Sequence, residues 1–377
     1  MEKQNSSFKK TARSVLSYVF IDGLSGMATG LFCTLIIGTI IGQIGSLLSK
    51  TGVEFFTWLG YYVTLIGNFA KILMGAGIGL GVAFKTGKNP LAAISGGVAG
   101  MIGAYAAQII KGTVLQGSVT SLASVGEPLG AFVAAFVAIE IGSLVIGKTK
   151  VDIIIVPLAA IVSGAAIGLL IGPPISAFMK FLGEIINTAA NQQPILMGIL
   201  VAALMGVALT LPISSAAIGV SLGLSGIAAG AAVVGCCCQM VGFAVMSFKE
   251  NRFGGLFAQG LGTSMLQMPN LVKHPVCWLP PVISSIILGP IASATLYIEG
   301  LNGGFISDAI GSGMGTAGLV GPISTFFTML NAGTNTLITL LLIALFCFIL
   351  PGALTWSISF LMRKIGWIKD GDLKLDL

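Results

Sequence analysis

Ten long apolar runs, separated by short connections rich in lysine and arginine, constrain this chain more than any other feature. Each run is long enough, or nearly so, to cross the roughly 30 Å hydrocarbon core of a bilayer as a helix. A membrane β-barrel would instead show alternating segments of about ten residues, so the runs predict an all-α fold. The candidate membrane segments are residues 24–48, 55–84, 91–110, 128–147, 152–172, 194–222, 225–247, 277–297, 317–335 and 336–360.

The composition agrees with a protein embedded in lipid. Hydrophobic residues make up 55% of the 377 and charged residues only 8%, whereas soluble domains carry about 25% charged residues. The 53 glycines fit helices that pack closely through small residues. The net charge of +6 lies mostly in short connections, where it sets topology. We therefore expect a lipid bilayer as the surroundings and no nucleic-acid partner.

The positions of the basic residues predict how the chain is threaded. Lysine and arginine favour the cytoplasmic side of short connections, and clusters stand at residues 85–88, 148–150 and 249–252. Placing all of them inside puts both termini in the cytoplasm. We expect a cytoplasmic interfacial segment over 1–23, a single membrane domain over 24–362, and a cytoplasmic tail over 363–377.

The stretch LTLPISSAAI, residues 209–218, interrupts one of these apolar runs. If residues 194–222 crossed the membrane once, Lys249 and Arg252 would lie outside. A hairpin broken around 208–222, which enters and leaves on one side, restores the cytoplasmic placement. Pro212 cannot continue a helical hydrogen-bond ladder, and broken backbone at membrane depth is tolerated where it lines a cavity. The alternative is a simple proline kink packed against neighbouring helices.

Three other segments also predict irregular or interfacial backbone. With these segments taken into account, the apolar runs predict about eight to ten transmembrane helices. Residues 254–276 are too polar and too interrupted to span. The same topology argument favours a second re-entrant stretch near 305–335. Residues 174–190, after Pro173 and Pro174, are typical of an amphipathic helix at the interface.

Polar residues inside apolar segments are candidate functional residues, because the bilayer makes them costly. A neutral set suits hydroxyls or amides better than phosphates, and a charged set could neutralise or couple to a cargo. Asn68 and Lys71 share a helical face, and Lys71 could neutralise an anion, pair with Glu140 or extend to the interface. Glu140 could couple to protons or form a structural pair. The neutral candidates are Thr210, Ser214, Ser215, Gln239, Gln267, Asn270 and His274.

The order of several motifs in residues 126–218 resembles the core of fructose-type enzyme IIC, the membrane permease of the bacterial phosphotransferase system. A glycine-rich helix and a basic loop precede a helix opening with Ile155, Val156 and Pro157. A Gly-Pro-Pro exit, an amphipathic helix, Leu-Met-Gly and the motif at Pro212 follow. The similarity continues more weakly through residues 227–252 and 263–270.

The sequence departs from the fructose pattern where that family has charged and amide side chains. Its acid, asparagine and lysine at the break are replaced by Ala208, Ser214 and Ser215, and its downstream glutamate by Met265. An ionised acceptor makes the stronger hydrogen bonds, so its loss argues against phosphorylating fructose transport. The chain is more similar to a divergent branch of enzyme IIC-like proteins that includes a regulator of a clostridial haemolysin.

The resemblance implies a multi-pass protein of the bacterial plasma membrane, a homodimer, and a permease for a small polar, sugar-like solute. Phosphorylation would need separate soluble phosphotransfer proteins, since we expect no fused phosphotransfer domain. A membrane sensor that binds the solute without net transport is the alternative. No acid–base or metal-ligand constellation is visible. We therefore expect no catalytic residue, no metal site and no cofactor, and we do not expect the chain to be an enzyme by itself.

Overall fold

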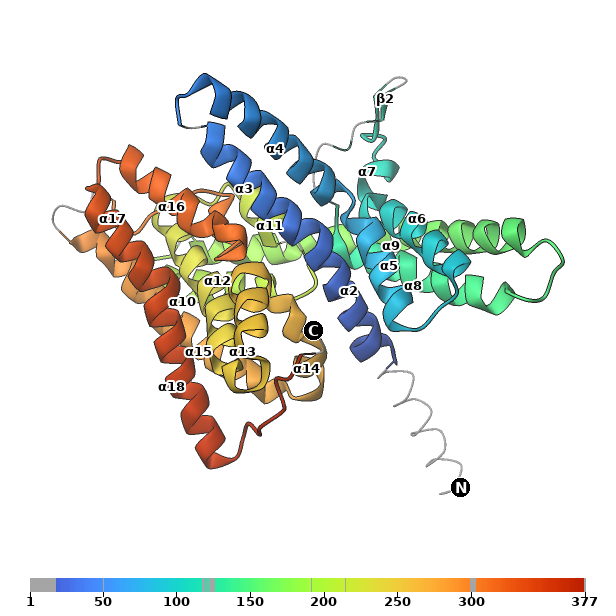
Figure 1. Ribbon diagram of the computed structural model, residues 1–377. Coiled ribbons are helices and arrows are strands. Elements are labelled where there is room, and N and C mark those ends of the chain that lie inside the picture. Colours follow the sequence, from blue (N-terminus) through green and yellow to red (C-terminus); the bar gives the residue numbers. More distant parts are fainter. Residues whose placement is uncertain are drawn as a thin grey trace. The chain divides into compact units, whose positions relative to one another are not determined.

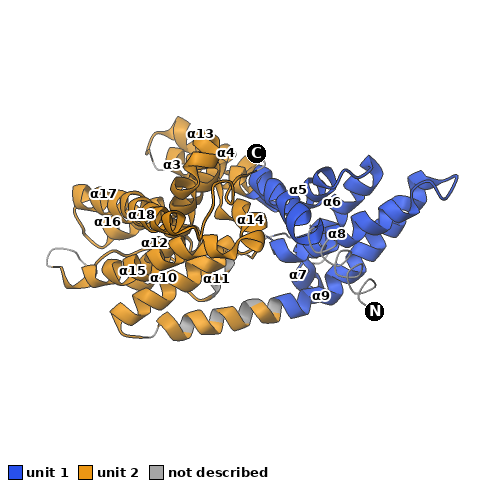
Figure 2. Cartoon of the chain, turned by 90° about the horizontal axis from the view of Figure 1, so that it is seen from below, with its two compact units in different colours: residues 1–35, 69–176 blue, residues 36–68, 177–377 orange. Residues whose placement is uncertain are grey.

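The computed structural model contains two compact units, shown in different colours in Figure 2. Unit 1 comprises residues up to Leu35 and Phe69–Ser176, and unit 2 comprises Ile36–Asn68 and Ala177–Leu377. The structure describes residues 18–49, 51–116, 119–120, 122, 126–190, 192–213, 215–298 and 303–375.

Unit 1 is built from helices that approach one another through glycine. Helix α5 packs against α2 and α6, and α6 packs against α8. A Cβ on Gly26 would lie 2.6 Å from the Gly81 carbonyl oxygen, so α2 and α5 have backbone-to-backbone contact there. The elements that carry residues of this unit are η1 (Tyr18–Gly23), α2 (Leu24–Leu31), η2 (Phe32–Ile36), the end of α4 (Glu54–Ile72), α5 (Met74–Lys85), α6 (Pro90–Ala104), α7 (Ala106–Ile110), β1 (Leu115–Gln116), β2 (Val119–Thr120), α8 (Pro128–Val145) and α9 (Asp152–Ala190).

Unit 2 surrounds one deeply buried helix, α12. Helix α12 packs against α10, α15 and α18 (Figure 1), and 89% of its most apolar 18-residue window is buried. The helices of this unit are α3 (Ile37–Ser49), α4 (Glu54–Ile72), α10 (Pro194–Thr210), α11 (Ser215–Ser221), α12 (Gly226–Met246), α13 (Phe248–Phe257), α14 (Met268–Lys273), α15 (Leu279–Ala294), α16 (Val320–Asn331), α17 (Thr336–Ile343) and α18 (Leu350–Ile365).

Short turns of 3₁₀ or π-helix join these helices, and most of them lie where the sequence predicts irregular backbone. They are η3 (Ala258–Gly262), η4 (Ser264–Gln267), η5 (Pro275–Trp278), η6 (Thr295–Tyr297), η7 (Gly311–Gly313), η8 (Ala317–Leu319) and η9 (Ala344–Ile349). Most of residues 254–276 and the first part of 305–335 are therefore interrupted helix.

The helices confirm the predicted all-α, polytopic membrane fold. Among the described residues, six helices are long and apolar enough to span a bilayer. A seventh span forms if α4 and α5, bent by 52° at a short break, are one crossing. Two further apolar helices, α6 and α10, are shorter than these spans, and the predicted number of eight to ten crossings stays a prediction.

One expectation was wrong at Pro173 and Pro174. Helix α9 continues through both prolines to Ala190, so residues 174–190 are not a separate helix in this structure. Each proline removes its own N–H donor and crowds the carbonyl four residues earlier, but Ser and Thr side chains or local adjustment can satisfy the freed carbonyls in membrane helices. A proline pair therefore marks a weak point in the ladder but does not by itself end the helix.

The packing of α12 against α10 predicts a large effect of one methyl group. A Cβ on Gly235 would overlap the backbone carbonyl of Ala202, and overpacking of this kind costs about 1–3 kcal/mol. We expect Gly235→Ala to lower the melting temperature of the purified protein. Gly352→Ala is the matched control, because its Cβ would meet Val245 at an ordinary 3.4 Å. Equal melting temperatures for the two variants would contradict this packing.

Candidate functional site

The break at Pro212 ends α10. Helix α10 runs to Thr210, Leu211 is extended with φ −66° and ψ 153°, and α11 begins at Ser215. Steric conflict with a following proline pushes the preceding residue into this extended region. The chain therefore breaks its helix here and does more than bend. Ser214 lies outside the described residues, and the re-entrant path through the membrane stays a prediction.

Four side chains meet beside this break, and they are called the Gln239 cluster here: Thr210, Gln239, Ser264 and Trp278. The Thr210 hydroxyl lies 3.2 Å from Gln239 Oε1 and 2.9 Å from the Ser264 hydroxyl. Trp278 Nε1 donates to Gln239 Oε1 over 3.0 Å. Thr210, Gln239 and Ser264 are each fully buried. The structure thus brings together two predicted site residues, Thr210 and Gln239.

Ser264 and Trp278 also belong to this cluster, although the sequence predicts neither of them as a site residue. Ser264 follows Thr263, whose hydroxyl accepts the Met265 backbone N–H and caps η4. Trp278 ends η5, just before α15. They reach Thr210 and Gln239 from positions 54 and 39 residues further along the chain. Position beside the irregular segment 254–276 was the only available signal.

The Gln239 side-chain amide has an unused donor group. Its Oε1 accepts two hydrogen bonds, while Nε2 has no hydrogen-bond partner among the described residues. A buried amide without a partner costs about 1–3 kcal/mol, and such groups in native proteins call for a functional or structural reason. A ligand oxygen that accepts from Nε2 would supply the missing bond.

Gln267 and Asn270 do not bond to the Gln239 cluster among the described residues. Their partners are neighbouring side chains and carbonyls near the C-terminal end of the described chain. Gln267 Nε2 donates to Gln259 Oε1 at 2.8 Å and to the Leu373 carbonyl at 3.1 Å. Asn270 Nδ2 donates to Gln267 Oε1 at 2.8 Å and to the Lys374 carbonyl at 2.9 Å. Their amide donors are therefore engaged by protein, and a role in solute binding stays a prediction.

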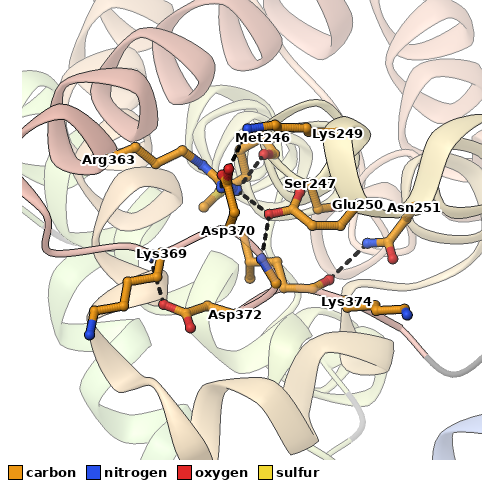
Figure 3. Close-up of polar contacts among 12 residues, drawn as sticks. Met246, Ser247, Lys249, Glu250, Asn251, Arg363, Lys369, Asp370, Asp372 and Lys374 are labelled. Atoms are coloured by element: carbon orange, nitrogen blue, oxygen red, sulfur yellow. Dashed lines mark hydrogen bonds and ion pairs between the residues drawn. The ribbon is translucent and has the colours of Figure 1, made fainter.

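The C-terminal segment, residues 367–375, is held on unit 2 beside α14 (Figure 1). Asn251 Nδ2 donates to the Leu373 carbonyl and Asn251 Oδ1 accepts the Leu375 N–H, both at 2.8 Å. Figure 3 shows Asn251, Glu250 and Arg363 gathered around this segment. The Leu373 side chain is fully buried. Residues 367–375 of the predicted tail thus form part of the packed unit.

Ion pairs add to the attachment of the C-terminal segment. Arg363 pairs with Glu250 at 2.7 Å and with Asp370 at 2.9 Å, and Lys249 also pairs with Asp370. The hydrogen bond from Lys249 holds the pKa of the Asp370 carboxyl below its usual range. Since this carboxyl is exposed, water screens the pair, and its contribution to stability is small.

The remaining neutral candidates lie in separate places. Ser215 donates to the Gly313 carbonyl over 2.6 Å and is buried, so it joins α11 to η7. His274 lies with Nε2 at 3.7 Å from Asp372 Oδ1, and 45% of its side chain is exposed. His274 is therefore partly open to solvent next to the C-terminal segment.

Glu140 has a different cation partner from the one considered in the sequence. It pairs with Lys88 at 2.9 Å and accepts a hydrogen bond from the Tyr18 hydroxyl at 2.7 Å. The pair with Lys71 is not the one that forms, because Lys88 lies directly before α6, which packs on α8. One third of the Glu140 side chain is exposed, so it is less buried than its apolar sequence context predicts. On α4, Asn68 is exposed and Lys71 is partly buried.

In this fold, membrane helices are interrupted beside a buried, uncharged polar cluster. This arrangement is typical of polytopic membrane proteins that transport small solutes. The comparison with protein families agrees, since residues 21–375 match the family described as Phosphotransferase system, EIIC. The chain belongs to this family. No curated protein matches it. The family confirms the resemblance to enzyme IIC and makes the chain a sugar-type permease component, a multi-pass protein of the bacterial membrane.

Proposed function

We propose that the chain moves a small, neutral, sugar-like solute across the membrane and binds it at the Gln239 cluster. The observation that carries the proposal is the buried Gln239 Nε2, which has no partner among the described residues. Substrate hydroxyls can accept from this group and donate to neighbouring hydroxyl oxygens. The break after Thr210 supports the same location, because transporter sites form at discontinuous helices.

The uncharged character of the cluster supports a neutral solute over an anionic one. Its members offer two hydroxyls, one carboxamide and one indole N–H. A phosphate or carboxylate group would be desolvated beside these groups without a cation to balance its charge, which is costly. Sugars and related polyols match this set of donors and acceptors better.

Finer features of the family resemblance remain part of the proposal. They include the divergent, fructose-type-like branch with the haemolysin regulator, and a homodimer with both termini in the cytoplasm. Separate soluble phosphotransfer proteins would phosphorylate the solute, if it is phosphorylated. Ligand contacts from Ser214, Ser215, Gln267, Asn270 and His274, and a charge-coupling role for Asn68, Lys71 and Glu140, are likewise proposed.

Uptake into proteoliposomes tests transport and separates it from the sensor alternative. Purified protein is reconstituted, a solute that raises its melting temperature is identified, and uptake of the labelled solute is followed. We expect saturable uptake that falls in Thr210→Val. Thr339→Val is the control, because Thr339 is equally buried in unit 2, and among the described residues its hydroxyl bonds to the carbonyl of Asn335, the N-cap of its own helix. Binding without uptake would contradict transport and support a sensor.

A further inference from the structure

A basic cavity lies in unit 2 between α13, α18 and the C-terminal segment. No residue of the Gln239 cluster lines it. Its volume is about 610 Å³, within the range of roughly 300–1,000 Å³ that suits small ligands. Four cationic side chains and a single carboxylate line it: Lys249, Arg252, Arg363, Lys364 and Asp370. The lining therefore carries an excess of positive charge.

Two of these cations form no ion pair with any residue that the structure describes. Lys249 and Arg363 both bind Asp370, and Arg363 also binds Glu250. No ion pair involves Arg252 or Lys364 in the part of the chain that the structure describes. Figure 3 shows Lys249 and Arg363 converging on Asp370. The Asp370 carboxylate thus marks a position where an anion binds both Lys249 and Arg363. Arg252 and Lys364 are available to bind a further anion.

A buried hydroxyl also lines the cavity without a partner. Ser359 is 2% exposed, and its Oγ has no hydrogen-bond partner among the described residues. An oxygen of an oxyanion would accept a hydrogen bond from this hydroxyl while the cations neutralise its charge. Ser359 therefore points to a ligand independently of the basic residues.

The backbone at Arg252 adopts a strained conformation that is unfavourable for stability. Arg252 has φ 50° and ψ −148° inside α13, a conformation that glycine adopts far more readily. Strained residues cluster at ligand sites, where the surrounding structure holds them. Here the strained residue supplies one of the two unpaired charges of the cavity.

The aromatic residues of the lining indicate where the ligand comes from. Trp356 and Phe360 are stacked with ring centroids 5.6 Å apart, and each is 52% exposed. They lie in the last turns of Thr336–Ile365, a helix long and apolar enough to span the membrane. Exposed aromatic and basic residues at the end of a spanning helix are typical of the lipid headgroup region, and basic pockets there bind anionic headgroups.

We propose that this cavity binds a phosphate group, held by Arg252, Lys364 and Ser359 together with the two cations that Asp370 now engages. The aromatic residues favour an anionic phospholipid as its source over a free phosphate. Asp370 competes with the ligand, so binding loosens the attachment of the C-terminal segment. The residues that line the cavity include none of the Gln239 cluster.

Thermal unfolding of the full chain in detergent tests the proposal with three probes. These are phosphatidylglycerol, phosphatidylcholine with the same acyl chains, and inorganic phosphate. We expect phosphatidylglycerol to raise the melting temperature and phosphatidylcholine to leave it unchanged. A response to inorganic phosphate as well would support the site with a free phosphate as a further ligand. No response to either anionic probe overturns the proposal.

Variants tie the response to the cavity. Arg252→Gly with Lys364→Gln should weaken the apparent affinity for the responding probe at least tenfold. The glycine also relieves the strained backbone, so loss of folding does not explain the effect. Lys148→Gln with Lys150→Gln removes the same charge from exposed positions in unit 1 and should leave the response intact. Equal responses from the two double variants would overturn the proposal.

Two single substitutions should act in opposite directions. Ser359→Ala removes the unpaired hydroxyl and should reduce the response while leaving the melting temperature without probe unchanged. Asp370→Asn removes the competing carboxylate and should strengthen the response, although it weakens the attachment of the C-terminal segment. If Asp370→Asn reduces the response instead, Asp370 does not compete for the site.

Discussion

Replacing Gln239 with leucine is expected to lower the affinity for the transported solute by about tenfold or more. Loss of a ligand hydrogen bond worth about 1.5 kcal/mol corresponds to roughly that factor. The variant also leaves the Trp278 N–H without its acceptor, so we expect a lower melting temperature. Solute-induced thermal shifts, measured over a range of concentrations, give the affinity.

A gentler substitution separates binding from folding in this cluster. Trp278→Phe keeps an aromatic ring and removes the N–H that donates to Gln239. Gln239 Oε1 then keeps only its bond to Thr210, and the amide is less firmly oriented. We expect a weaker affinity with a nearly normal melting temperature. A Gln239→Leu variant that folds and binds the solute as tightly as the natural protein would show that the cluster is structural.

Truncating the buried leucine of the C-terminal segment is expected to destabilise unit 2 strongly. Leu373 is fully buried in a cluster with Phe243, Met268 and Ile368, and removal of such a side chain costs about 2–5 kcal/mol. We expect Leu373→Ala to lower the free energy of unfolding in denaturant by this amount. Leu375→Ala is the control, because Leu375 is only partly buried and bonds to Asn251 through its backbone.

Limited proteolysis gives a second readout for the C-terminal segment. Asn251→Ala removes both hydrogen bonds that clamp Leu373 and Leu375, so cleavage after Lys369 and Lys374 should become faster. Cleavage in unit 1 connections should keep its rate. An unchanged cleavage pattern, with Leu373→Ala as stable as Leu375→Ala, would show that the segment is held by other contacts.

The sequence allowed the break of α10 and two members of the Gln239 cluster to be predicted because their causes are local. Pro212 lacks an N–H and restricts Leu211, whatever the rest of the chain does. Polar residues in apolar runs stand out individually, which is how Thr210 and Gln239 were selected. The family resemblance was likewise detectable, since it depends on the order of motifs along the chain.

Partners between distant segments could not be predicted in the same way. Ser264 reaches Thr210 because the irregular segment 254–276 packs on α10 and α12, and Trp278 reaches Gln239 from the end of η5, just after that segment. Gln267 and Asn270 meet carbonyls more than one hundred residues away. Such contacts follow from tertiary packing, which periodicity and composition do not determine.

Charged residues and prolines show the same limit. The face of a helix did not decide whether Glu140 pairs with Lys71 or Lys88, because the choice depends on which helix end lies nearest. Pro173 and Pro174 predicted a helix boundary, but α9 continues through them. Local rules state which conformations or partners a residue disfavours. Tertiary packing determines whether other contacts offset the free-energy cost of adopting them.

The most direct test of the central claim is a thermal-shift screen of the natural protein, Thr210→Val and Thr339→Val. The screen covers neutral sugars, sugar acids, sugar phosphates, nucleosides and small anions, since binding to the folded state raises the melting temperature with ligand concentration. We predict that a neutral sugar or polyol stabilises the natural protein and Thr339→Val, and stabilises Thr210→Val much less. Stabilisation only by another class, or equally in all three proteins, would contradict binding of a sugar-like solute at the Gln239 cluster.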